Sequence, residues 1–321
     1  MRNRQAYLIL AAAAVLLSAC VKSEVTSSKV SFAPVASKST RAIISGATYP
    51  QTESFAVSAF HGGSTPYFEN LTASYKSALN LWATEEDQYW PLAGSLIFKA
   101  YSPAGLTGVT IDETDGITAA DYTVSLHYND SDESKKDFCY ATAEVADCAN
   151  HPESVPLVFS HALSQVVFRV KAASYEEGIT FAMTSLALKG INSVGDFADG
   201  TWSNQETEVD YPLSSSETAL TYTANEPDTI HICSYLFIPQ RLGANAALSV
   251  GYNVEQTVNN TTFTLQNPPV SVPIGVAGYI RNWEPGKKYI YTISIGLNNL
   301  ITFTATAVEW NEALNSGVVV E

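Results

Sequence analysis

Apolar and polar residues alternate along many short stretches of the chain. The alternation is regular in 122–128, 289–295 and 301–307, where every second residue is apolar or aromatic. This period of two is typical of a β-strand with one buried face. The segment 95–102 adds a continuous core strand that Pro103 ends, and Pro285 and Gly286 form a turn before 289–295. The pattern predicts an all-β protein.

The strands predict two domains in series. They are short and separated by Gly, Pro and polar turns, which is typical of antiparallel β-sandwiches. Pro152 and Pro156 flank a break in composition, so we predict an N-terminal domain over 42–152 and a C-terminal domain over 153–321. Only 73–82 has a helical spacing, in which Tyr75, Leu79 and Trp82 are four and three residues apart.

The N-terminal residues predict export with a lipid anchor. Arg2 and Arg4 precede an apolar run, 7–17, that is too short to span a bilayer. Leu17-Ser18-Ala19-Cys20 matches a bacterial lipobox, so residues 1–19 are expected to be a signal peptide and Cys20 the acylated residue of an outer-membrane lipoprotein. Several acyl chains anchor stably, because each buried CH₂ contributes about 0.8 kcal/mol. The alternative is a secretory signal in which the cysteine is incidental.

The segment 20–41 places a lone strand between that anchor and an arginine. Val30, Phe32 and Val35 form a short strand candidate, followed by a polar stretch that ends at Arg41 before Ala42. Two interpretations stay open. The segment is a tether with an ordinary first strand, or it holds a removable strand that proteolysis after Arg41 releases.

Composition narrows the function. A net charge of −15 repels phosphate backbones, so no nucleic acid partner is expected. Besides Cys20, the chain has three cysteines, of which Cys139 and Cys148 could form a disulfide in an oxidising compartment, while Cys233 is interpreted as a buried apolar residue. Their spacing does not match a metal site.

No stretch has a recognisable catalytic motif. The sequence lacks GxSxG, SxxK, HExxH and nucleotide-binding glycine loops. The five histidines are scattered, and His161 is interpreted as a structural residue on a strand. The five tryptophans are interpreted as core residues rather than a sugar platform. We therefore expect no catalytic residue, no metal and no cofactor.

Several segments together resemble the fimbrillin family of lipoprotein-derived pilins. In chain order, the matching segments are the lipobox at Cys20, 30–33, 40–42, 89–103, 137–141, 157–165, 237–240, 283–289 and 308–310. The resemblance covers nearly the whole chain. It implies two transthyretin-like β-sandwich domains and no enzyme activity.

The resemblance also implies a route of assembly into a surface fimbria that contributes to cell adhesion. An arginine-specific protease would cut after Arg41 and remove the strand of Val30, Phe32 and Val35. A strand from another pilus subunit would then fill the groove by donor-strand exchange. The candidate donor is the tail 311–321, in which Val318 and Val320 face one side. The alternative function is a monomeric surface lipoprotein that binds a glycan or a peptide, and the sequence identifies no receptor.

Overall fold

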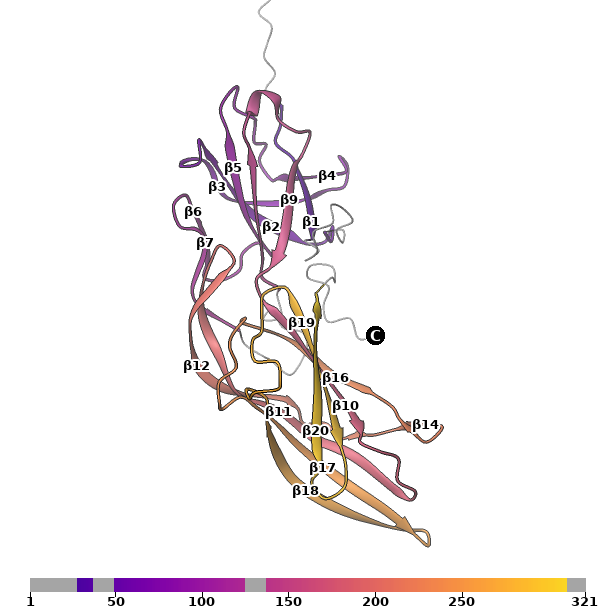
Figure 1. Cartoon of the computed structure of the whole chain (residues 1–321). Coiled ribbons are helices and arrows are strands. Elements are labelled where there is room, and N and C mark those ends of the chain that lie inside the picture. The colour runs from indigo at the N-terminus through magenta and orange to yellow at the C-terminus, as the bar shows by residue number, and fades with distance from the viewer. Residues whose placement is uncertain (1–27, 37–48, 125–136, 311–321) are drawn as a thin grey trace, which may run out of the picture.

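The computed structural model describes residues 28–36, 49–124 and 137–310, and these residues form an all-β fold (Figure 1). The strands are β1 (Phe32–Ala36), β2 (Ser54–His61), β3 (Thr65–Lys76), β4 (Leu81–Thr84), β5 (Leu96–Ser102), β6 (Val109–Asp112), β7 (Gly116–Thr123), β8 (Cys139–Val145), β9 (Val155–His161), β10 (Ser164–Ala172), β11 (Ile179–Ala198), β12 (Thr201–Ser214), β13 (Thr218–Ala219), β14 (Tyr222–Thr223), β15 (Glu226–Pro227), β16 (Ile230–Phe237), β17 (Ala247–Val258), β18 (Thr261–Pro273), β19 (Lys287–Ile295) and β20 (Ile301–Glu309). A 3₁₀ turn, η2, spans Cys148–Asn150. In these described ranges, no helix has the length and hydrophobicity needed to cross a membrane. The all-β prediction is confirmed.

The first part of the molecule is a closed barrel rather than the expected open sandwich. Its strands follow the order β1-β4-β3-β2-β5-β8-β9, and β1 closes the ring because it pairs with both β4 and β9. Aromatic rings fill the interior, including Phe55, Phe98 and Phe159, which have no exposed surface. These rings come from β2, β5 and β9, so one core holds the barrel together.

The second part is a β-sandwich. The sheet β16-β10-β19-β20 faces the sheet β18-β17-β11-β7-β6, and one apolar cluster joins them. Phe168 of β10 stacks on Tyr291 of β19, with ring centroids 5.9 Å apart. Trp283 is buried and donates its indole N–H to the Tyr291 hydroxyl at 3.1 Å.

Two strand pairs depart from the antiparallel prediction. β1 runs parallel to β9, and β10 runs parallel to β19. Parallel neighbours cannot be joined by a short turn, so the partners come from distant parts of the sequence. The β1–β9 pair connects the start of the described chain to residues more than a hundred positions later, starting with Phe32 opposite Val155.

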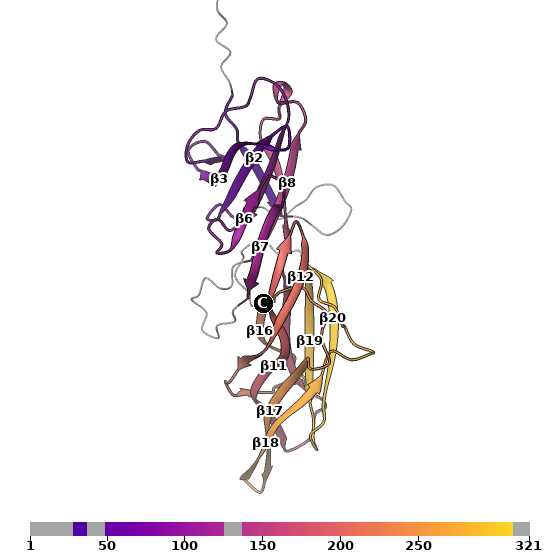
Figure 2. The same cartoon turned by 90° about the vertical axis from the view of Figure 1, so that its left-hand side faces the viewer.

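The predicted boundary between 152 and 153 is misplaced. Val155, Leu157 and Phe159 of β9 are buried in the barrel core, so β9 belongs to the first part. The change occurs in the short connection between β9 and β10. In addition, the β6–β7 hairpin leaves the first half of the sequence and pairs with β11 of the sandwich (Figure 2). The two parts are therefore interlocked rather than simply sequential.

The helix expected over 73–82 is wrong. This segment forms the end of β3, a turn and the start of β4. Tyr75 and Trp82 do contact each other, with ring centroids 5.6 Å apart, but across the hairpin rather than along a helix. Asn80 takes a positive φ of 54° in the turn, a conformation that asparagine tolerates better than most residues.

Candidate functional site

The first strand occupies a slot in the barrel wall. Residues 28–36 lie between 82–90 on one side and 153–159 on the other, and we call the space that they fill the β1 slot. On the β9 side, β1 pairs in register from Phe32 opposite Val155 to Ala36 opposite Phe159. On the opposite side, it pairs with β4 only where Phe32 faces Trp82. β1 thus closes the barrel between β4 and β9, and Figure 1 shows it beside β9.

Three alternate side chains of this segment point into the barrel. Val30 and Phe32 are each 2% exposed, and Pro34 is also buried. The Phe32 ring makes edge-to-face contacts with Phe55 and Phe98, with centroids 5.6 and 6.0 Å apart. Burying each large apolar side chain contributes roughly 1.5–3 kcal/mol, so Phe32 is the principal anchor of the strand.

Of the residues predicted to fill the groove, Val30 and Phe32 are buried in the barrel core, whereas Val35 is not. Val35 is only half-buried, because the period of two that starts at Val30 puts position 34 on the inner face. Pro34 takes the inner position and has no N–H to donate. It lies beyond the single pair between β1 and β4, so it interrupts no pairing on that side.

Polar groups hold the start of the segment. The Val30 N–H donates to the Gln88 carbonyl at 2.7 Å, and the Ser31 carbonyl accepts from the Val155 N–H at 2.8 Å. The Ser31 hydroxyl also lies 2.7 Å from that of Ser154. Lys29 forms an exposed ion pair with Asp87, which raises the lysine pKa chiefly through their hydrogen bond. Exposed pairs of this kind stabilise little, so backbone bonds and side-chain burial retain the segment.

Taking β1 away would open the barrel. The remaining order, β4-β3-β2-β5-β8-β9, is a sheet with two free edges. The β9 edge would present five residues that now pair with β1, and the rings of Phe55 and Phe98 would lose a neighbour. An open edge beside an apolar groove readily accepts another strand.

The other predicted processing residues lie outside the described part of the chain. They are Cys20, Arg41, Ala42, Val318 and Val320. Around Arg41, the described residues end at Ala36 and resume at Tyr49. Tyr49 is buried against the rings of Phe55 and Trp82, and it donates its hydroxyl to the Ser54 carbonyl at 3.0 Å. A cut after Arg41 would therefore separate β1 from the rest of the barrel.

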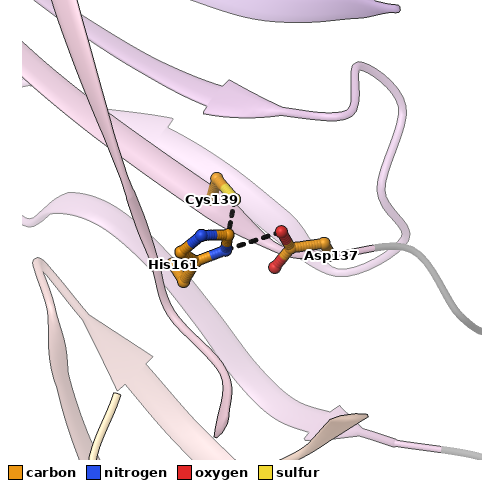
Figure 3. A group of neighbouring side chains, drawn as sticks. All are labelled: Asp137, Cys139 and His161. Carbon is orange, nitrogen blue, oxygen red and sulfur yellow. Dashed lines mark hydrogen bonds and ion pairs between the residues drawn. The ribbon is translucent and has the colours of Figure 1, made fainter. Parts of the chain in front are cut away.

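A second cluster lies at the far end of β9. His161 Nδ1 donates to Asp137 Oδ2 at 2.6 Å, and the Cys139 sulfur lies 3.6 Å from the same nitrogen (Figure 3). All three side chains are buried. The His161 ring also stacks on Trp310, with centroids 3.8 Å apart. His161 is therefore a partnered core histidine, as the sequence predicted.

The cluster has the residue types of a metal or nucleophile site, but its arrangement favours a structural role. Among the described residues, Asp137, Cys139 and His161 form a group whose ligand atoms lie within 4.8 Å of one another. The closest two ligand atoms are hydrogen-bonded to each other. Burial, and then the charge of Asp137, raise the pKa of the Cys139 thiol well above its ordinary value. A neutral thiol without solvent access is a poor nucleophile.

The disulfide considered between Cys139 and Cys148 is absent, and both residues have free thiols. Cys139 begins β8, whereas Cys148 lies in η2 beyond the opposite end of that strand. Seven residues of strand span about 20 Å, and a disulfide needs Cα atoms within about 7 Å. The extended path of β8 therefore keeps the two cysteines apart. Cys233 is half-buried in β16.

Trp310 fixes the point at which the C-terminal tail begins. Trp310 is 5% exposed, and its backbone N–H donates to the Gly286 carbonyl at 3.1 Å. Its stacking partner, His161, is the last residue of β9. Ala36 of β1 faces Phe159, two residues earlier. The origin of the tail is thus next to one end of the β1 slot, which no sequence pattern predicted.

The tryptophans do not form an exposed platform. Trp82, Trp90, Trp283 and Trp310 are buried. Trp202 is half-buried and donates its N–H to the Ala162 carbonyl at 2.6 Å. The interpretation of these residues as core residues is confirmed, and they offer no flat surface to a sugar ring.

Solved structures from Bacteroides, Parabacteroides and Porphyromonas match this chain. A candidate cell adhesion protein from Bacteroides uniformis has a TM-score of 0.51 and 17% identity, covering 88% of this chain and 99% of its own. Another candidate cell adhesion protein, from Parabacteroides distasonis, also has a TM-score of 0.51, with 12% identity and coverages of 88% and 97%. The tip fimbrial protein Mfa3 from Porphyromonas gingivalis, with a C-terminal truncation, has a TM-score of 0.38 and 10% identity, covering 80% and 94%. The comparison with curated proteins found no match.

The fold places this chain in a class of all-β proteins with two parts. One part is a barrel closed by its own first strand, and the other is a sandwich interlocked with it. Within that class, the family model described as Fimbrillin-like matches residues 40–310. The chain belongs to the fimbrillin-like family. The resemblance inferred from the sequence is confirmed.

Proposed function

We propose that this chain is a structural subunit of a surface fimbria that contributes to cell adhesion and has no enzyme activity. It is exported as an outer-membrane lipoprotein anchored through Cys20. An arginine-specific protease then cuts after Arg41, β1 leaves, and a strand of another pilus subunit takes its place. The family match supports the fimbrial role. The transthyretin-like topology of both parts, implied by the same resemblance, belongs to this proposal.

The observation that carries the proposal is the position of β1. This short strand closes a seven-stranded barrel. Its covalent connection to the other six strands is the segment that contains Arg41. Val30 and Phe32 are its nearly inaccessible inner residues. A closing strand can leave without breaking the other six strands' pairings with one another, and this supports replacement of β1 rather than unfolding.

Retention of β1 before assembly has a physical reason. An open parallel edge with an exposed aromatic groove is prone to aggregation. While β1 is in place, the large hydrophobic side chains of β9 are buried except for that of Val158. A lipid-anchored precursor that carries its own strand can therefore reach the surface without associating early.

The test uses a soluble precursor with Cys20→Ser and an Arg41→Ala control. Brief treatment with an arginine-specific protease is followed by N-terminal sequencing and electrophoresis of unboiled samples. We expect a new N-terminus at Ala42, and a detergent-resistant complex once a partner strand such as peptide 28–37 is added, only in the chain that retains Arg41. If cutting occurs elsewhere, or the cut chain keeps β1 and stays monomeric, the proposed activation is wrong and a monomeric surface lipoprotein that binds a glycan or peptide becomes the better account.

A further inference from the structure

The β1 slot is most selective at its centre. The inner positions, in order along the slot, are Val30, Phe32 and Pro34. Only the central one reaches two other rings, Phe55 and Phe98, at edge-to-face angles of 86° and 83°. A smaller side chain at this position would leave a cavity among side chains that remain in the barrel wall.

The tail of this chain does not match that centre. Residues 311–321 read NEALNSGVVVE and contain no aromatic residue. The alternate positions on one side are Leu314, Ser316, Val318 and Val320. With three of them aligned to the slot, Ser316 or Val318 occupies the ring position. The opposite side offers Ala313, Asn315, Gly317 and Val319, which match less well.

We infer that the emptied slot selects an extended, uncharged segment of a different subunit, with an aromatic ring at the position of Phe32, in preference to the tail of a second copy. The inference rests on the proposed replacement of β1. It makes this chain an acceptor for a partner of another sequence. Phe55 and Phe98 would pack against the ring, and the exposed edge of β9 would form the backbone hydrogen bonds.

The test measures exchange of peptides into the cut full-length chain. The soluble Cys20→Ser protein is cut with the arginine-specific protease and titrated with fluorescein-labelled peptides, while anisotropy is recorded. The probes are peptide 28–37, its Phe32→Leu and Phe32→Val variants, tail peptide 311–321, and the tail peptide with Val318→Phe. We expect the Phe32→Val peptide and the native tail to bind at least 30-fold more weakly than peptide 28–37. The Val318→Phe tail should recover at least fivefold over the native tail.

The outcomes separate the two claims. If peptide 28–37 itself does not enter the cut chain, replacement of β1 fails and the selectivity fails with it. If peptide 28–37 enters but the native tail or the Phe32→Val peptide binds within threefold of it, only the selectivity is overturned, and the tail of a second copy becomes the occupant.

If the cut chain does not stay folded, a second measurement on the uncut protein tests the same inference. In the uncut protein, Phe32→Leu, Phe32→Val and a Val30→Ala control are compared by hydrogen exchange of β9. The inference predicts at least tenfold faster exchange for 155–159 in the Phe32→Val chain, with smaller increases in the Phe32→Leu and Val30→Ala chains. Equal protection in the Phe32→Val and Val30→Ala chains would contradict a ring-selective slot.

Discussion

Phe32→Ala in the soluble Cys20→Ser chain tests how firmly the first strand is held. Phe32 is 2% exposed and packs against Phe55 and Phe98 at 5.6 and 6.0 Å. Replacing a buried phenylalanine by alanine costs about 3–5 kcal/mol, from lost transfer energy and the cavity that remains. We expect the barrel to lose that much free energy of unfolding, which is a large share of the stability of an ordinary domain.

The assay is urea unfolding followed by tryptophan fluorescence, because Trp82 and Trp90 lie in the barrel core. The matched control is Val158→Ala on β9, whose side chain is 49% exposed. Surface substitutions usually change stability by no more than about 0.5 kcal/mol. A loss below about 1 kcal/mol for Phe32→Ala, or one equal to that of the control, would refute the claim that the ring anchors β1 in a packed core.

Three further predictions address the rest of the molecule. Asp137→Ala should lower the free energy of unfolding by about 3–5 kcal/mol, because it leaves buried His161 without its carboxylate partner. Glu144→Gln, at an exposed position near the other end of β8, should change the free energy of unfolding little, and equal values for the two variants would contradict the structural role. Alkylation of the folded, non-reduced Cys20→Ser chain should leave buried Cys139 unmodified, and mass spectrometry after denaturation should count three free thiols; a count of one would restore the Cys139–Cys148 disulfide. Burial, followed by the charges of Arg169 and Lys288, lowers the pKa of His231 below 6.5. Neutral His231 therefore contributes its full share of stability above pH 6.5, and that share is lost as the pH falls through the lowered pKa. The urea midpoint of His231→Gln should therefore decrease less between pH 7.5 and pH 5 than that of the parent chain, and parallel curves would contradict this assignment.

The strand content could be predicted because the physical signal is local. A period of two in apolar residues, as in 289–295, needs no knowledge of the partner strand, and β19 follows that pattern. The inner positions of the first strand were partly predictable in the same way. Val30 and Phe32 set the period, but Pro34 was interpreted as a break, so the third inner position was assigned one residue too far along.

Strand pairing could not be predicted because it depends on tertiary contacts. The register of β1 beside β9 is set by which face of each strand reaches the common core. The same holds for the β6–β7 hairpin, which crosses to the sandwich and pairs with β11. The contact of His161 with Asp137 likewise arises only when β8 and β9 lie side by side. The prolines predicted a domain boundary between residues 152 and 153, but the pairing of β9 with β1 places the boundary after β9.

The central claim is that β1 is a removable part of the barrel, and hydrogen exchange of β9 tests it most directly. The soluble chain is measured intact, after cutting at Arg41 with removal of the released segment, and after addition of peptide 28–37. We predict that the amides of 155–159 are protected at first, lose at least tenfold protection when the segment is removed, and regain it with the peptide. Protection of β9 that persists after the segment has been removed would contradict the account, because β9 would then not depend on β1 for its pairing.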